Sequence, residues 1–509
     1  MPTAAENNKR IARNTLVLYV RMFITLAVTL CTSRVVLAAL GVEDFGIYNV
    51  VGGVVSMFAI VTASMSSAIS RFITFELGKG DEPRLRSVFQ TAVGIQIAFA
   101  MIVLVLAEVV GVWFLNTHIN IPPERMDAAN LVLQCALLAF MMNVLHVPFH
   151  AAVIAHERMN VFAYISILDV VMKLGVALAL GLVGGDRLKV YAPLLFVVAV
   201  VVCILYAAYA VSVFKECTLR PRFDRRITRE MAGFASWTFI GTSATILRDQ
   251  GGNVVLNLFG GPVVNAARGI SLQVGHAVQS FSENFMTALR PQIIKSYASG
   301  DRDYMMTLVV QGARLSFYLL LLIALPVMIN ADYLLHLWLK EVPPHTVAFV
   351  ILAVVFTLSE SVSTPLITAM LATGKIRDYQ LVVGGLQLMN LPIAYGLLRL
   401  GLQPESLLWT AICISQCCLA ARLIMLRRLV GLSISGFLRR VYLNVIVVTA
   451  LSAAVVLLCG FGSDVAFGGF VVSTLAAVVV TALMEMFIGC NRRERAMVWK
   501  KVKQMTRRQ

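Results

Sequence analysis

Long runs of apolar residues alternate with short polar and basic segments along nearly the whole chain. A helix needs about 20 apolar residues to cross the hydrocarbon core of a membrane. By that measure the sequence predicts an all-α integral membrane protein with fourteen spans and little room for soluble domains between them. The predicted spans are residues 14–40, 47–75, 88–115, 128–154, 161–183, 190–213, 231–259, 263–289, 305–329, 347–371, 379–398, 407–425, 441–459 and 465–488.

The composition agrees with a membrane protein. Of the 509 residues, 59% are hydrophobic and only 14% are charged, which is more apolar surface than a soluble protein could bury. The net charge of +16 does not indicate nucleic-acid binding, because Lys and Arg lie mostly in the short segments between spans. Since no phosphate-binding glycine loop, catalytic triad or metal motif is evident, we expect neither an enzyme nor a cofactor or metal site.

The basic residues also predict the orientation. One set of alternate loops holds most of them, and loops rich in Lys and Arg stay in the cytosol. Both termini are therefore expected in the cytosol, and no cleavable signal peptide is evident before the first span. The opposite loops hold only Arg125, Arg187, Lys189, Lys340 and Arg399.

The polar stretch 215–230, KECTLRPRFDRRITRE, separates two apolar tracts. Such a basic run is usually a solvated loop, with contact to anionic membrane lipids as an addition. We interpret it as a cytosolic hinge between residues 1–214, which hold helices 1–6, and residues 231–426, which hold helices 7–12. Residues 427–509 would then form helices 13 and 14 and a basic tail.

The two six-helix halves resemble each other. Segments 148–158 and 365–375 share a proline, two alanines and a final basic residue, at an offset of 365 − 148 = 217. Arg71 before a Gly-Asp pair likewise matches Arg290 before another. Two halves of equal topology place a substrate cavity between them, near the membrane midplane. The sequence therefore predicts two six-helix repeats and an accessory C-terminal pair of helices.

Polar residues spaced by three or four positions mark helix faces that line a cavity, because such residues are costly against lipid. Spans 231–259 and 263–289 carry clear stripes, and span 47–75 carries a milder one with Asn49, Gly53 and Ser56. Arginines also lie on the first two spans. The candidates for substrate binding are Arg21, Arg34, Arg71, Arg248, Asn253, Arg268, Gln273 and His276, and the candidates for ion coupling are Asp249 and Glu283.

Each candidate also has a structural interpretation. Small polar residues often only pack helices together, and buried charged residues can form an internal ion pair. Several arginines suit a phosphate or pyrophosphate, which a guanidinium binds with two hydrogen bonds, whereas a buried acid suits a coupling ion. The Glu43-Asp44 pair in the first outward loop is compatible with a membrane glycosyltransferase, although a large outward domain is missing.

The first two spans carry a family resemblance. Arg34, the segment LGVEDFGIY at 40–48 and SRFI at 70–73 resemble the opening of bacterial Wzx-type polysaccharide or O-antigen flippases. These belong to the multidrug/oligosaccharidyl-lipid/polysaccharide (MOP) superfamily. The resemblance implies two MATE-like lobes in the bacterial cytoplasmic (inner) membrane. They would move an undecaprenyl-pyrophosphate-linked oligosaccharide to the outer leaflet by alternating access, for surface polysaccharide biosynthesis.

In similar proteins, cavity arginines bind the pyrophosphate, and the matching positions here are Arg34, Arg248 and Arg268. Arg71 matches too, but it lies at the cytosolic end of its span, where it would meet the headgroup on entry or anchor the helix. The implied partners are the lipid-linked oligosaccharide, a polysaccharide polymerase and glycosyltransferases. Drug-exporting relatives often couple transport through an acid on helix 1, which this chain lacks. Coupling to H⁺ or Na⁺ therefore stays open, and the alternative function is a multidrug or small-solute antiporter.

Overall fold

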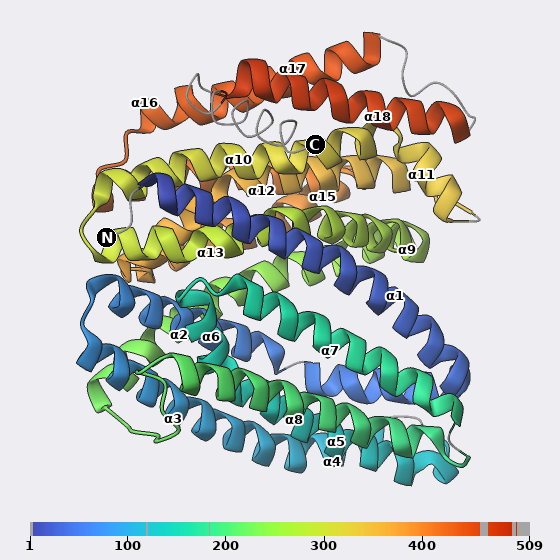
Figure 1. Cartoon of the computed structure of the whole chain (residues 1–509). Helices are drawn as coiled ribbons and strands as arrows, with labels where there is room; N and C mark the ends of the chain where they lie inside the picture. The colour runs from blue at the N-terminus through green and yellow to red at the C-terminus, as the bar shows by residue number, and fades with distance from the viewer. Residues whose placement is uncertain are drawn as a thin grey trace, which may run out of the picture. The chain divides into compact units, whose positions relative to one another are not determined.

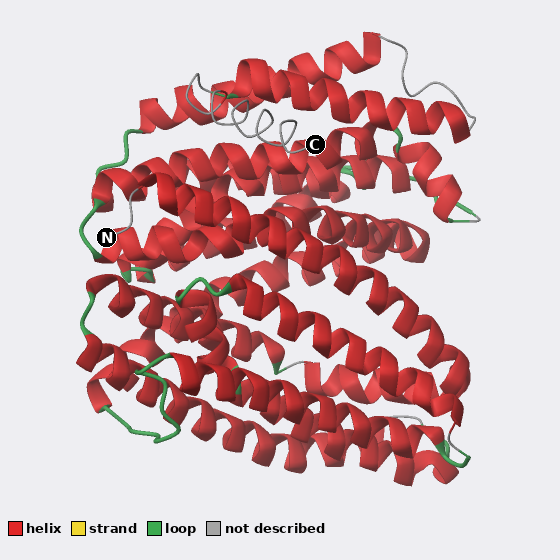
Figure 2. Cartoon of the chain, viewed as in Figure 1, coloured by secondary structure: helices red, strands yellow, loops and turns green. Residues whose placement is uncertain are grey.

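The computed structural model describes residues 4–56, 58–118, 121–182, 184–339, 341–458, 467–490 and 495. Every element in these ranges is a helix (Figures 1 and 2). Eleven helical segments of the described chain are long and apolar enough to cross a membrane. The protein is therefore an all-helical membrane protein, and the number of fourteen spans stays a prediction.

The chain forms two compact units, Met1–Thr242 with Ile294–Asp301, and Ser243–Ile293 with Arg302–Gln509. Helix α9 (Arg225–Ala298) runs through both. The first unit also contains α1 (Ala4–Ser56), α2 (Ala59–Lys79), α3 (Glu82–Leu106), η1 (Ala107–Gly111), α4 (Val112–His118), η2 (Pro123–Arg125), α5 (Met126–Leu145), α6 (Val147–Ala155), α7 (Met159–Ala179), η3 (Leu180–Leu182) and α8 (Arg187–Val213). The second contains α10 (Arg302–Ile329), α11 (Ala331–Trp338), α12 (Thr346–Thr373), α13 (Arg377–Leu388), α14 (Asn390–Arg399), α15 (Ser406–Val430), α16 (Ile434–Phe437), η4 (Leu438–Tyr442), α17 (Leu443–Leu458), α18 (Phe467–Met484) and η5 (Glu485–Gly489). The predicted boundary at 215–230 differs from this division by contacts, and the assignment of lobes to 1–214 and 231–426 stays a prediction.

Each unit has its own apolar core. In the first, Leu133 of α5 packs in one cluster with Val51 of α1 and Ala192 of α8. In the second, Leu256 of α9 clusters with Phe349 of α12. Helices α17 and α18 pack on each other and on α10 (Figure 1), as an accessory pair would.

Three predicted spans, 47–75, 231–259 and 263–289, are not among the eleven apolar segments of the described chain. They are the spans with the polar stripes, so their polar faces lower the mean hydropathy. Span 47–75 is also not one helix, because α1 ends at Ser56 and α2 begins at Ala59. The side chains of Asn49, Gly53 and Ser56 lie outside the described residues.

Two glycines break the long helices at matching places. Gly41 in α1 has φ 79° and ψ 171°, and Gly261 in α9 has φ 68° and ψ −168°. This conformation is open essentially only to glycine. Each break separates two spans that the sequence predicts as neighbours, and the two glycines are 261 − 41 = 220 residues apart.

Further residues with positive φ occur in matched positions. Such residues mark points where the chain must turn, and their spacing is close to the offset found in the sequence. The backbone therefore favours the predicted repeat, which stays a prediction. The pairs are Gly80 with Gly300, Glu157 with Gly374, and Gly185 with Gly401, at offsets of 300 − 80 = 220, 374 − 157 = 217 and 401 − 185 = 216.

The Gly261→Ala variant is expected to lose about 1–3 kcal/mol of unfolding free energy, because a Cβ is strained in this backbone conformation. The matched control is Gly269→Ala, since Gly269 is helical and a Cβ there meets nothing within 4 Å. That variant should be neutral or more stable by about 0.5–1 kcal/mol. Equilibrium unfolding of both variants in detergent micelles makes the comparison, and equal stability would contradict the assigned strain.

The six basic side chains of the stretch 215–230 are all exposed, as expected of a solvated segment, and its role as a hinge stays a prediction. Its last part is helical, because α9 begins at Arg225 after the Asp224 cap. The preceding part lies along α3, where the Arg222 N–H donates to the Gln90 carbonyl at 3.3 Å. The backbone of the stretch therefore contacts α3 at Arg222, while its basic side chains stay exposed.

The start of the stretch is attached as well. His156, after α6, makes a 2.6 Å hydrogen bond with Glu216. Burial alone would raise the pKa of the Glu216 carboxyl, but this bond and a backbone hydrogen bond hold the pKa below its usual range.

Candidate functional site

The central candidates form one polar cluster in the second unit. Arg248 donates from Nε to Asp249 Oδ1 at 2.9 Å and from Nη2 to Asp249 Oδ2 at 3.1 Å. Its guanidinium carbon lies 5.0 Å from the ring centroid of Phe356 on α12. Arg268, which is only 7% exposed, lies within electrostatic reach of both Arg248 and Asp249. The break at Gly261 places Arg268 on the helical segment that follows the one carrying Arg248 and Asp249.

This cluster has two cations for one carboxylate. The Arg248 guanidinium is already bonded to Asp249, whereas the buried Nε of Arg268 has no hydrogen-bond partner among the described residues. A buried N–H group without an acceptor costs about 1–3 kcal/mol. An anionic oxygen beside Arg268 would satisfy that donor and balance the excess positive charge.

The remaining candidates on α9 lie apart from this centre or are only partly engaged. Asn253 donates weakly to Gln250 at 3.4 Å, and its Oδ1 is buried without a partner among the described residues. The side chains of Gln273 and His276 are exposed. Asn253 therefore lies one helical turn after Asp249, whereas Gln273 and His276 lie on an exposed face of the helix.

Glu283 does not lie with Asp249. It follows Arg268 by 283 − 268 = 15 residues, about 22 Å along a helix. Its side chain is 41% exposed and pairs with Arg290 at 2.8 Å. Glu283 is therefore paired at the basic end of the helix, and its role in ion coupling stays a prediction.

The arginines of the first half are not gathered in one place. Arg71 is buried, and its guanidinium carbon lies 4.4 Å from the ring centroid of Phe75 and 4.8 Å from that of Phe72. This packing favours the anchoring role among the two considered for Arg71. The side chain of Arg34 is exposed, because α1 turns this position away from the packed face that buries Val36. Its role in substrate binding stays a prediction.

Arg21 belongs to an aromatic cluster that the sequence analysis missed. Its guanidinium carbon lies 4.5 Å from the ring centroid of Phe162 on α7. His146 stacks on Tyr206 at 5.3 Å, and His150 meets Phe162 edge-on at 5.2 Å. The two histidines are four residues apart beside a proline in a predicted span, which was the available signal.

A second missed network lies in the second unit. Ser415 of α15 hydrogen-bonds Glu360 of α12, and Arg422 of α15 bonds Tyr379 of α13 and feels the charge of Glu360. Arg422 is only 1% exposed, and its Nε and Nη1 have no hydrogen-bond partner in the described chain. Cys418, one turn before Arg422, is within electrostatic reach of both Arg422 and Arg248. The network therefore adjoins the Arg248 cluster.

Asp44, half of the acidic pair that suggested a glycosyltransferase, is buried and paired with Arg125. Arg125 also pairs with Asp186 at 2.8 Å. This ion-pair group joins α1, η2 and the start of α8 within the first unit. Such pairing gives Asp44 a structural role and weakens the case for an acidic active site.

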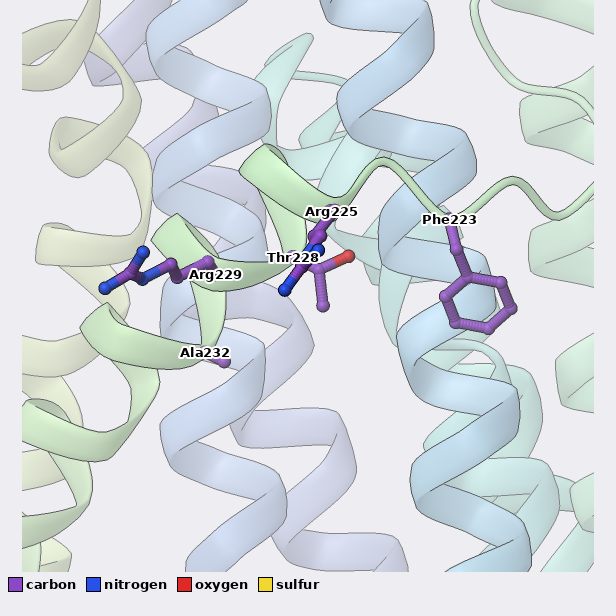
Figure 3. Close-up of a pocket in the computed structure, with 5 residues that line it drawn as sticks. All are labelled: Phe223, Arg225, Thr228, Arg229 and Ala232. Atoms are coloured by element: carbon purple, nitrogen blue, oxygen red, sulfur yellow. The ribbon is translucent and has the colours of Figure 1, made fainter.

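A cavity of about 530 Å³ lies in the first unit, where the basic stretch enters α9 (Figure 3). Phe223 lines it from the loop, and Arg225, Thr228, Arg229 and Ala232 line it from the first turns of α9. None of the predicted site residues lines this cavity. Its two arginines agree with the anionic-lipid contact expected of this stretch.

Solved structures share this fold. An outward-facing multidrug resistance transporter of the MATE family, in the MOP superfamily, is 14% identical, with 83% of this chain and 95% of that chain covered and a TM-score of 0.71. A MOP superfamily transporter from Pyrococcus furiosus is 14% identical, with 85% and 96% covered and a TM-score of 0.69. In that protein, reverse polarity of the binding pocket suggests a different function.

The sequence comparisons are partial. An uncharacterized membrane protein, EpsK, from Bacillus subtilis (strain 168) is 19% identical over 292 residues, which is 57% of this chain and 57% of that protein. The chain thus matches little more than half the length of this relative. Residues 18–179, all in the first unit, match the MatE family model. The chain is therefore a multi-pass membrane protein with the fold of the MATE transporters of the MOP superfamily.

Proposed function

We propose that this protein is a flippase of the bacterial cytoplasmic membrane. It moves an undecaprenyl-pyrophosphate-linked oligosaccharide from the inner to the outer leaflet by alternating access, for surface polysaccharide biosynthesis. The MATE-like fold supports a transporter. The main support for an anionic substrate is the cluster of Arg248, Asp249 and Arg268 in the second unit. Two positive charges lie there beside one negative charge.

A pyrophosphate matches the chemistry of this cluster. It offers several anionic oxygens, and a guanidinium is the side chain that binds such oxygens with two parallel hydrogen bonds. The unpartnered Nε of Arg268 is a donor directed to no described acceptor. Asp249 fixes Arg248 through Nε and Nη2, so Arg248 is held in place before the substrate arrives.

A cation-coupled multidrug or small-solute antiporter is the second candidate. It is favoured by the solved multidrug MATE transporter of the same fold, and Asp249 would be its coupling acid. Two arginines beside that acid would repel a cationic drug, which is why we place the antiporter second. A pocket of reversed polarity in one MOP transporter supports the view that charge, and not fold, separates substrates in this superfamily.

The test uses purified protein in liposomes that contain a lipid-pyrophosphate oligosaccharide. A glycosidase added outside should digest the inner-leaflet pool only when the protein is present. Liposomes with heat-inactivated protein are the control for leakage. Failure of the glycosidase to reach that pool, together with dye movement driven by an H⁺ or Na⁺ gradient, would contradict the flippase and support the antiporter.

A further inference from the structure

Glu157, in the turn between α6 and α7, has a backbone conformation that glutamate rarely adopts. Its φ is +59°, and a non-glycine residue there is uncommon and strained. The residue at the matching position of the second half is Gly374, with φ +73°. Glycine therefore suits this turn, and the glutamate at 157 needs another explanation.

The carboxylate of Glu157 supplies that explanation. The side chain is 1% exposed, with Arg10 Nε 2.7 Å from Oε2 and Lys295 Nζ 2.7 Å from Oε1. The Arg10 contact is an ion pair without hydrogen-bond geometry, whereas Lys295 donates a hydrogen bond. Asn14 donates to the Glu157 carbonyl at 3.3 Å. One buried carboxylate thus holds the start of α1 and the end of α9 on the same turn.

The end of α9 is held in a second way. Gly78 of α2 lies so close that a Cβ there would be 2.8 Å from the Cα of Lys295 and 2.9 Å from the Cβ of Ala298. Segment Ile294–Asp301 accordingly packs in the first unit, while the preceding part of α9 from Ser243 belongs to the second. The last segment of α9, beyond the part that carries Arg248 and Arg268, therefore packs inside the first unit.

The placement of these contacts suggests their use. The loops rich in Lys and Arg, which include Arg10 and Lys295, are expected on the cytosolic side. Removing one partner of a buried charge is strongly destabilising, whereas an ion pair exposed to water contributes little. A contact that becomes weak once water reaches it suits a part that must open and close.

We propose that Arg10, Glu157 and Lys295 form a cytosolic clasp that fastens the end of α9 to the first unit. The clasp is closed while the cytosolic side is shut, and it opens when that side admits substrate. Glu157 replaces the glycine of its repeat counterpart because the clasp needs a carboxylate at the turn. The clasp rests on the alternating-access part of the proposed function and is independent of the substrate.

The test is labelling of a cysteine at the packed helix end. Ala298→Cys is introduced into a chain whose nine native cysteines are replaced by alanine, and inverted membrane vesicles are treated with a maleimide. The wild-type clasp should keep labelling slow. Glu157→Gln removes the charge of the carboxylate and should raise the labelling rate about tenfold, which corresponds to about 1.4 kcal/mol of lost interaction. An unchanged rate would overturn the clasp.

Two further variants separate the charge from the turn. Glu157→Gly relieves the backbone strain, so the chain should remain folded while labelling rises as in Glu157→Gln. Slow labelling in Glu157→Gly would show that only the turn matters and would overturn the clasp. The reversed set Glu157→Lys with Arg10→Glu and Lys295→Glu should return labelling toward the wild-type rate, and fast labelling in this set would contradict a role for paired charges.

Asp303→Asn is the matched control, because Asp303 is an exposed acid at the start of α10 and its loss should leave labelling unchanged. The assay needs no substrate and no flipping. A protein that fails to flip the lipid-linked oligosaccharide can therefore still show the clasp, and the two proposals fail independently.

Discussion

Arg248→Ala is expected to reduce flipping about 30- to 1,000-fold while the protein inserts and accumulates normally. Truncating one partner of a desolvated charge pair costs about 2–4 kcal/mol of interaction with the other groups of the site, and each 1.4 kcal/mol is a factor of ten. The variant removes one of two guanidiniums from the cluster and also leaves Asp249 without its partner. The remaining carboxylate would then face the pyrophosphate. The measurement is the initial rate of glycosidase access at equal protein per liposome.

Two variants serve as controls for this prediction. Arg248→Lys keeps the charge but loses the planar pair of donors, so it should fall between the wild type and Arg248→Ala. Arg290→Ala removes an arginine from the same helix that pairs with Glu283 outside the cluster, and it should flip at close to the wild-type rate. Wild-type flipping in Arg248→Ala would remove this residue from the site.

Asp249 separates the two candidate functions. Asp249→Asn should stop gradient-driven transport if the protein is a cation-coupled antiporter, since the coupling acid is lost. In the flippase the same variant leaves both arginines free for the pyrophosphate and should keep substrate binding.

Glu360→Leu is expected to destabilise the protein by about 3–5 kcal/mol, because it leaves the buried Arg422 without its nearby negative charge. Arg422 is nearly inaccessible, and Tyr379 is a neutral partner for it. The double variant Glu360→Leu with Arg422→Leu should recover most of this loss, since removing both charges leaves no uncompensated charge in the buried site. Equilibrium unfolding in detergent micelles gives both values.

The double variant also tests whether the two residues act as a pair. Independent contributions would make the double variant as unstable as the sum of the two single variants, which would contradict the predicted coupling. Thr364→Ala is a suitable control, because Thr364 lies one turn from Glu360 on α12 and only hydrogen-bonds its own helix.

Much of the fold can be predicted from the sequence, since span length and hydropathy are local properties. The apolar spans and the turns near Gly41 and Gly261 follow from runs of residue types, whereas the packing of α17 and α18 on α10 does not. The end of α1 at Ser56 and the start of α2 at Ala59 do not follow, because the polar residues there are equally compatible with one continuous helix that lines a cavity. The exposure of Arg34 could not be predicted either. Helical periodicity shows which residues share a face of the helix, but not which other helices pack against that face.

The candidate site was predictable only where its members share a helix. Arg248, Asp249 and Arg268 lie along α9 with Gly261 between them, so the stripe pattern could find them. Glu360, Tyr379 and Arg422 lie on three helices, and only tertiary packing brings them together. The sequence around Glu157 is typical of a helix end. Its alignment with Gly374 in the predicted repeat was the signal that a glutamate occupies a turn position suited to glycine.

The low hydropathy of the two halves of α9 has a consequence for how the chain enters the membrane. Each Arg, Asp or Lys at the centre of a lone helix opposes insertion by about 2.5–3.5 kcal/mol, and α9 carries Arg248, Asp249 and Arg268 in its two halves. These segments insert poorly when judged one at a time. They need apolar neighbours such as α12, which supplies Phe356 beside Arg248, to be present before their charges are covered. We therefore expect the two charged segments of α9 to insert stably only together with the apolar helices that pack against their charges.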